Sequence, residues 1–126
     1  MKRILLVEDD PAVNYILRRY LEAAGFAVLA ASGGKEALDL FAASPADLVV
    51  TDFRMPGMNG EELLVRLREQ HPALPALIVS AYGTELSLQL AGVPVLRKPV
   101  DAAVLVETVN NLLLDAETVA LNKPAP

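Results

Sequence analysis

The sequence predicts an α/β fold in which one parallel sheet of five strands is covered by helices on both faces. Short runs of branched apolar residues recur along the chain, and stretches with apolar residues at helical spacing separate them. Continuous apolar runs are typical of strands buried on both faces, and strands that alternate with helices are joined by right-handed crossovers into parallel sheets. The chain has 126 residues, of which 53% are hydrophobic, and this is enough for one domain with its own core.

Five segments are predicted as strands because each is a short, mostly apolar run bounded by polar residues, glycine or proline. They are residues 4–7, 26–30, 48–51, 76–79 and 93–96. The first helix begins after Asp10, which can cap it, with Pro11 at its first position, and Gly25 ends its apolar pattern. A short second helix is predicted over residues 35–43, before a Ser-Pro pair.

Two further helices are predicted after the third and fourth strands. A loop rich in proline and glycine leads to Asn59, which with Glu62 has the spacing of a capping pair. The helix that this pair begins ends near His71, because a proline follows. A weaker pattern predicts a helix over residues 85–91, between the fourth and fifth strands.

The domain boundary is predicted from the last helix. Asp101 can cap this helix, and its apolar pattern continues through Leu114. We therefore expect one domain over residues 1–114 and a flexible tail over residues 115–126.

Composition excludes several classes of function. The chain has no cysteine, which excludes disulfides, thiolate metal sites and a catalytic thiol, and its one histidine, His71, excludes a metal site built from several histidines. The net charge is −5, which opposes binding to nucleic acid. No stretch reaches the roughly 18 apolar residues of a membrane helix. We expect a soluble, cytoplasmic protein that binds neither nucleic acid nor membrane.

Polar side chains follow four of the predicted strands. Glu8 and Asp9 come after the first strand, Asp52 after the third, Ser80 after the fourth and Lys98 after the fifth. The carboxyl ends of parallel strands meet at one edge of the sheet, where ligands of such folds bind. Crowded carboxylates repel unless a cation neutralises them, and ligands that are all oxygen favour Mg²⁺ or Mn²⁺. With a lysine and a hydroxyl for phosphate oxygens, the set predicts phosphoryl transfer.

Four motifs of the chain occur together in one known family. They are residues 6–10 (LVEDD), residues 51–60 (TDFRMPGMNG), residues 80–83 (SAYG) and the pair Lys98-Pro99. In this order and on these elements, the motifs resemble those of response regulator receiver domains, the phosphoacceptors of two-component signalling. The resemblance covers about residues 2–114. It implies a flavodoxin-like sheet with the strand order 2-1-3-4-5.

The resemblance implies a role for each acidic residue. Asp52 would accept a phosphoryl group from a histidine kinase or a histidine phosphotransfer protein and become an aspartyl phosphate. Mg²⁺ would be the cofactor. Asp9 would bind the ion directly, Glu8 through water, and Arg54 through its backbone carbonyl.

The resemblance also assigns the remaining site residues. Ser80 and Lys98 would each contact a phosphoryl oxygen, and Lys98 would report phosphorylation to the far face of the domain. A cis bond between Lys98 and Pro99 is implied as well. Such a protein is a signalling switch or a member of a phosphorelay, and not an enzyme: it catalyses only its own phosphorylation and dephosphorylation.

Two features depart from the family pattern. Receivers place an aromatic residue shortly before the lysine, where this chain has Val93, Val95 and Leu96. Only 17 residues separate Ser80 from Lys98, fewer than in most receivers. These departures leave open a second function, an interaction module of the same fold that works without phosphorylation.

A third reading is a Mg²⁺-dependent phosphohydrolase with an aspartate nucleophile, and it is disfavoured. Arg54 stands where the second aspartate of such enzymes is expected, and 126 residues leave no room for a cap domain. No helix-turn-helix or enzymatic output follows Leu114. A receiver that stands alone and one cut from a hybrid kinase or larger regulator both remain open.

Overall fold

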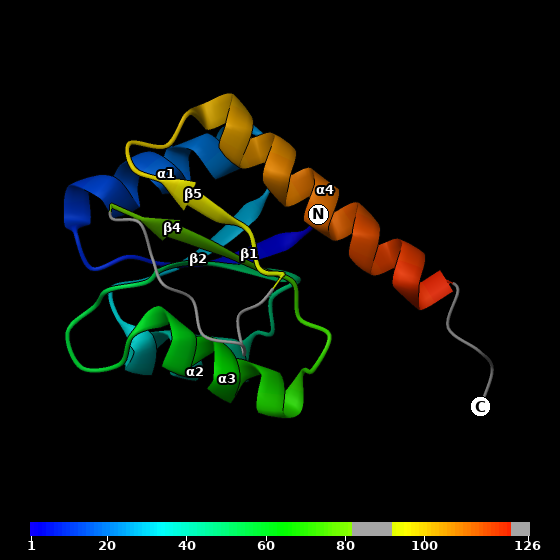
Figure 1. The fold of residues 1–126 in the computed structure, drawn as a ribbon, viewed down its shortest axis with the longest axis horizontal. Coiled ribbons are helices and arrows are strands. Elements are labelled where there is room, and N and C mark those ends of the chain that lie inside the picture. The colour runs from blue at the N-terminus through cyan, green and yellow to red at the C-terminus, as the bar shows by residue number, and fades with distance from the viewer. Residues whose placement is uncertain (82–91, 122–126) are drawn as a thin grey trace.

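The computed structural model describes residues 1–81 and 92–121 (Figure 1). Its elements are β1 (Arg3–Val7), α1 (Pro11–Ala23), β2 (Ala27–Ala31), α2 (Gly34–Ala43), β3 (Leu48–Asp52), α3 (Gly60–Gln70), β4 (Ala76–Ser80), β5 (Val95–Arg97) and α4 (Ala102–Leu121). The five strands form one sheet in the order β2-β1-β3-β4-β5, and every neighbouring pair is parallel. The predicted fold class and strand order are therefore confirmed.

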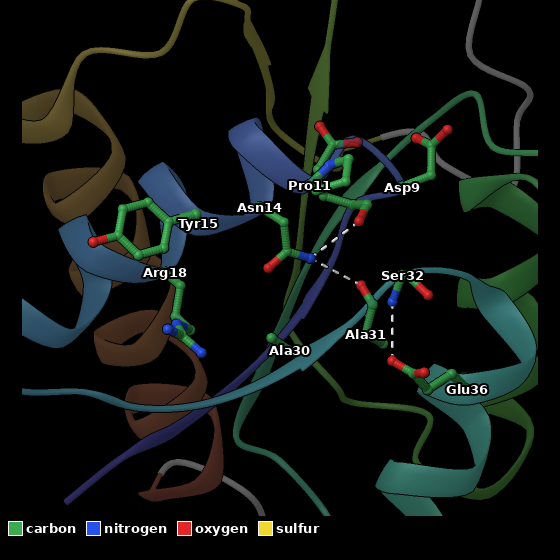
Figure 2. A pocket seen from close by; sticks show the side chains of 10 residues that line it. Asp9, Pro11, Asn14, Tyr15, Arg18, Ala30, Ala31, Ser32 and Glu36 are labelled. Carbon is green, nitrogen blue, oxygen red and sulfur yellow. Dashed lines mark hydrogen bonds between the residues drawn. The ribbon is translucent and has the colours of Figure 1, made fainter.

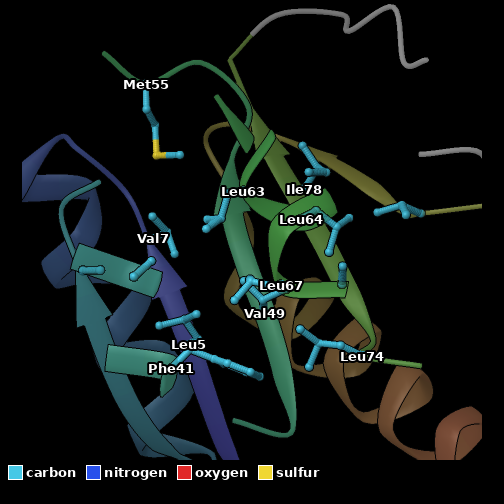
Figure 3. Close-up of a cluster of buried hydrophobic side chains, with 14 residues drawn as sticks. Leu5, Val7, Phe41, Val49, Met55, Leu63, Leu64, Leu67, Leu74 and Ile78 are labelled. Atoms are coloured by element: carbon cyan, nitrogen blue, oxygen red, sulfur yellow. The ribbon is translucent and has the colours of Figure 1, made fainter. Parts of the chain in front are cut away.

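Helices cover both faces of the sheet. In Figure 1, α1 and α4 lie on one side, and α2 and α3 lie on the other. The strands alternate their side chains between these two layers. On β1, Leu5 and Val7 belong to the cluster of buried side chains under α2 and α3, part of which Figure 3 shows, whereas Ile4 and Leu6 belong to the cluster on the side of α1 and α4. Since the four residues from Ile4 to Val7 are all buried, the sequence shows a continuous apolar run there.

Three helices begin at the predicted caps. A side-chain oxygen of Asp10 accepts hydrogen bonds from the first turn of α1, and Asn59 accepts one from the backbone N–H of Glu62 at 2.9 Å. Asp101 does the same for the first turn of α4. These caps satisfy backbone donors that have no partner inside the helix.

Two strands begin later than predicted. Phe26 is still part of the turn after α1, because its backbone N–H donates to the carbonyl of Leu21 at 3.2 Å, and Gly25 adopts a φ of +96° there. The fifth strand starts at Val95 and not at residue 93, because Pro94 has no N–H for a ladder; its carbonyl still accepts from Ile78 at 3.0 Å. The predicted helix over residues 85–91 lies outside the described residues.

The last helix is longer than predicted. It was expected to end at Leu114 and to be followed by a tail, but α4 continues to Leu121. No glycine or proline interrupts this stretch, and Glu117 forms a salt bridge of 3.3 Å with Lys2 at the start of the chain. Among the residues that the structure describes, no helix is both long and apolar enough to cross a membrane.

Candidate functional site

The predicted site residues meet at the carboxyl edge of the sheet. Asp52 and Ser80 are the last residues of β3 and β4, and Glu8 directly follows β1. Lys98 directly follows β5, where its backbone N–H donates to the carbonyl of Ser80 at 2.9 Å. The site therefore depends on the strand order, because its residues come from the ends of four separate strands.

Three carboxylates form a cluster at this edge. Glu8, Asp9 and Asp52 each offer an oxygen, and these atoms all lie within 4.8 Å of one another. Two of the acids are buried: Glu8 is 2% exposed and Asp52 9%, whereas Asp9 is exposed. Burial of two neighbouring carboxylates is unfavourable unless a positive charge lies close by.

Lys98 supplies such a charge. Its ammonium forms ion pairs with Glu8 and with Asp52, the latter at 3.0 Å. Burial alone would lower the pKa of Lys98, but its hydrogen bonds to the two acids outweigh this effect, so its pKa is raised. The lysine therefore remains charged at neutral pH.

The pKa of Glu8 is shifted far from its usual value. Burial raises its pKa from 4.5 to about 7, and the neighbouring Asp52 adds to this effect. The ammonium of Lys98 and the backbone N–H of Asp10 oppose it. One lysine does not fully compensate the crowding of the acids, so the cluster has capacity for a further cation.

The donor set of the cluster fits Mg²⁺. Carboxylate oxygens are the ligands that this ion prefers. Glu8, Asp9 and Asp52 each offer such an oxygen at one place, so these three residues could hold the ion together. Arg54 lies in the loop two residues after Asp52, and its contribution through a backbone carbonyl stays a prediction.

Two residues that support Asp52 were not assigned this role from the sequence. Thr51 is fully buried, and its hydroxyl donates to the backbone carbonyl of Asp52 at 2.8 Å. Gly60, the first residue of α3, lies so close that a Cβ there would be 2.4 Å from the same carbonyl oxygen. The motif containing Gly60 was visible in the sequence, but its contact with Asp52 depends on how the loop folds back.

The positions where receivers usually carry an aromatic ring are apolar and packed. Val93 is 8% exposed and belongs to the core on the side of α2 and α3, and Val95 packs against the same cluster. Tyr82, which could supply a ring, lies outside the described residues. The bond between Lys98 and Pro99 is cis, as the resemblance implied.

The sheet order defines a flavodoxin-like fold with an acidic site at its carboxyl edge, and the comparisons with known proteins identify the family. The chain belongs to the response regulator receiver domain family, whose model matches residues 4–110. It is therefore a receiver domain of the kind used in two-component signalling. Receiver domains are signalling switches and not enzymes in the usual sense.

Individual relatives agree with this assignment. The sensory/regulatory protein RpfC of Xanthomonas campestris is 34% identical over an aligned length of 126, and the match covers 94% of this chain but 17% of RpfC. The chain likewise covers only 16% of the transcriptional regulator NtrC of Klebsiella pneumoniae, at 36% identity over 77 residues. The chain thus matches one domain of much longer proteins.

Solved structures show the same fold. The receiver domain of the hybrid histidine kinase CckA is 37% identical, with a TM-score of 0.77, over 88% of this chain and 98% of that one. The response regulator TrrA of Thermotoga maritima, solved in complex with Mg²⁺ and BeF, is 31% identical, with a TM-score of 0.82, over 89% and 99%.

Proposed function

We propose that Asp52 is the phosphoacceptor of this receiver and takes its phosphoryl group from a histidine kinase or a histidine phosphotransfer protein with the help of Mg²⁺. The observation that most supports this is the position of Asp52. Its carboxylate is almost buried at the end of β3, beside two further acids and the ammonium of Lys98. This combination provides a nucleophile, ligands for a cation and a positive charge for phosphoryl oxygens.

The reaction moves the phosphoryl group from nitrogen to oxygen. A carboxylate oxygen of Asp52 forms a bond to phosphorus while the bond from phosphorus to the donor's imidazole nitrogen breaks, and that nitrogen keeps the electron pair. Glu8 and Asp9 would hold Mg²⁺ together with Asp52, and Arg54 would add its backbone carbonyl. When bound, the ion neutralises charge on the phosphoryl oxygens.

Lys98 and Ser80 are placed to sense the new group. Lys98 already donates to the carboxylate of Asp52, so a phosphoryl oxygen on that carboxylate comes within reach of the same ammonium. Ser80 is buried on the neighbouring strand and would donate its hydroxyl to another phosphoryl oxygen. Movement of these two side chains would carry the signal into β4 and β5.

The surface of α1 next to Lys98 is suited to the donor protein. Ile16 is 46% exposed, and it lines a hollow of about 350 Å³ between α1 and the segment from Lys98 to Val100. An exposed apolar surface beside a reactive group is a suitable contact for a partner. A donor helix that docks there would bring its phosphohistidine to the carboxyl edge of the sheet.

A titration with beryllofluoride tests the proposed site without relying on turnover. BeF₃⁻ has the shape and charge of a phosphoryl group, so it should bind the ¹⁵N-labelled chain only when Mg²⁺ is present. We expect new backbone amide signals for Asp52, Ser80 and Lys98, and none in Asp52→Asn. The same signals in Asp52→Asn, or in wild type without Mg²⁺, would overturn the assignment. The exposed Asp39→Asn should behave like wild type.

A further inference from the structure

Asn14 links the two strand ends next to the acidic cluster. Its side-chain amide donates two hydrogen bonds, to the backbone carbonyl of Glu8 at 3.0 Å and to that of Ala31 at 3.1 Å (Figure 2). Glu8 also donates its backbone N–H to the carbonyl of Ala31, at 3.1 Å. Asn14 therefore closes a ring of hydrogen bonds around the first residue of the cluster.

This ring occurs where the ladder between β1 and β2 ends. The last pair of the ladder is Val7 and Ala31. In a parallel ladder that continued, the carbonyl of Glu8 would accept from the backbone N–H of Gly33. The amide of Asn14 donates to this carbonyl instead, so Glu8 is fixed like a strand residue although it lies outside the strand.

The two segments beside this ring, the start of α1 and the turn after β2, are also held by hydrogen bonds. Asn14 lies in the first turns of α1, where its backbone N–H donates to the carbonyl of Asp10 at 2.9 Å. On the other side, the backbone N–H of Ser32 donates to a carboxylate oxygen of Glu36 at 3.0 Å, which holds the turn after β2 (Figure 2). The amide of Asn14 thus connects two segments whose own backbones are held by hydrogen bonds.

We propose that Asn14 is a positioning residue for the metal site: it fixes the backbone at Glu8 and thereby the directions of the Glu8 and Asp9 carboxylates. The inference rests on the magnesium site proposed above. Residues that orient metal ligands without binding the ion themselves typically change the metal affinity about 10-fold to 100-fold when they are removed. Loss of the amide should therefore weaken Mg²⁺ binding even though Asn14 does not itself bind the ion.

The test is the dissociation constant of Mg²⁺, measured on the full chain from the backbone amide shifts of Glu8 and Asp9. Asn14→Ala removes the amide, and Asn14→Leu removes it while keeping a side chain of similar size. We expect binding about 10-fold weaker in both variants. If one variant does not fold, the other still gives the result. Asn14→Gln keeps the two donors and should recover part of the affinity.

A matched control separates positioning from a general loss of stability. Leu113→Ala removes buried carbons from α4 and should lower stability with a Mg²⁺ affinity within about twofold of wild type. An unchanged Mg²⁺ affinity in Asn14→Ala or Asn14→Leu would overturn this inference but not the proposed function. An equal loss of affinity in Leu113→Ala would also overturn it, because the effect would then follow stability. Absence of Mg²⁺ binding by wild type would instead overturn the proposed function, and this inference with it.

Discussion

The ammonium nitrogen of Lys98 lies 3.0 Å from Oδ2 of Asp52 and is also hydrogen bonded to Oε1 of Glu8. One cation therefore joins residues at the ends of β5, β3 and β1. It supplies a single positive charge against the three carboxylates of the cluster. This imbalance favours a further cation at the site, such as the Mg²⁺ proposed above, and we expect the lysine to respond when the charge of Asp52 changes.

Replacing Lys98 should leave phosphorylation of Asp52 intact but reduce the conformational change that follows it. Lys98→Ala keeps the nucleophile and the three acids, so we expect phosphorylation by acetyl phosphate with Mg²⁺ to persist. The ammonium that would follow the phosphoryl group is lost, so backbone amide shifts in β4 and β5 should change by less than half as much as in wild type. Heteronuclear NMR before and after phosphorylation measures this. Shift changes of wild-type size would contradict the role of Lys98, and Lys35→Ala on α2 serves as the control.

The acidity of Glu8 predicts how stability varies with pH. Its pKa is raised from 4.5 to about 7 in the folded chain, so the stability linked to its proton is fully present below about pH 4.5 and is lost as pH rises through 7. Without Mg²⁺, Glu8→Gln should therefore be more stable than wild type at pH 8, by about 1–3 kcal/mol, and similar to it at pH 4.5.

Urea denaturation at both pH values measures this difference, with the exposed Glu107→Gln as the matched control. Addition of Mg²⁺ at pH 8 should stabilise wild type more than Glu8→Gln, because the ion compensates the charge that the variant lacks. A wild type that is as stable as Glu8→Gln at pH 8 without the ion would count against the raised pKa.

The contact between Gly60 and Asp52 predicts a strong effect of one methyl group. A Cβ at Gly60 would lie 2.4 Å from the carbonyl oxygen of Asp52, so the loop or the strand end must shift. We expect Gly60→Ala to cost about 1–3 kcal/mol in the free energy of unfolding and to slow phosphorylation. At Gly33 a Cβ meets no atom within 4 Å, and the control Gly33→Ala should stay within about 0.5 kcal/mol of wild type. Equal stabilities of the two variants would show that the loop adapts freely.

The exposed surface of α1 predicts a difference between large and small phosphodonors. Ile16→Asp places a charge on the apolar surface beside Lys98, so transfer from a phosphorylated histidine phosphotransfer protein should slow about 10-fold. Phosphorylation by acetyl phosphate should not change, since this donor makes no contact with α1. Val65, on α3 at the other face of the sheet, is 36% exposed, and Val65→Asp is the control. Equal slowing in both variants would place the docking surface elsewhere.

The fold was predictable because local signals agreed with the global pattern. Asp10, Asn59 and Asp101 each cap a helix as expected, and the apolar runs of β1, β3 and β4 became strands buried on both faces. The errors lie at the ends of elements. Phe26 is held in a turn by a hydrogen bond to Leu21, and α4 continues past Leu114 in the absence of any helix breaker.

The site was predictable only in part. Residues at strand ends can be read from the sequence, so the meeting of the acids, Ser80 and Lys98 at one edge of the sheet was expected. The supporting groups could not be found in this way. The amide of Asn14 meets the carbonyl of Ala31, 17 residues away, and Gly60 meets the carbonyl of Asp52. Both contacts depend on how the folded chain brings these segments together. Such an arrangement leaves no pattern in the sequence.

The role of Asp52 as phosphoacceptor is tested most directly by the intact mass of the chain after incubation with acetyl phosphate, with and without Mg²⁺. Wild type and Asp39→Asn should gain one phosphoryl group, about 80 Da, only when the ion is present, and Asp52→Asn should gain none. A gain that survives Asp52→Asn would contradict Asp52 as the acceptor. No gain in wild type, with Mg²⁺ binding confirmed separately, would mean that this receiver works as an interaction module without phosphorylation.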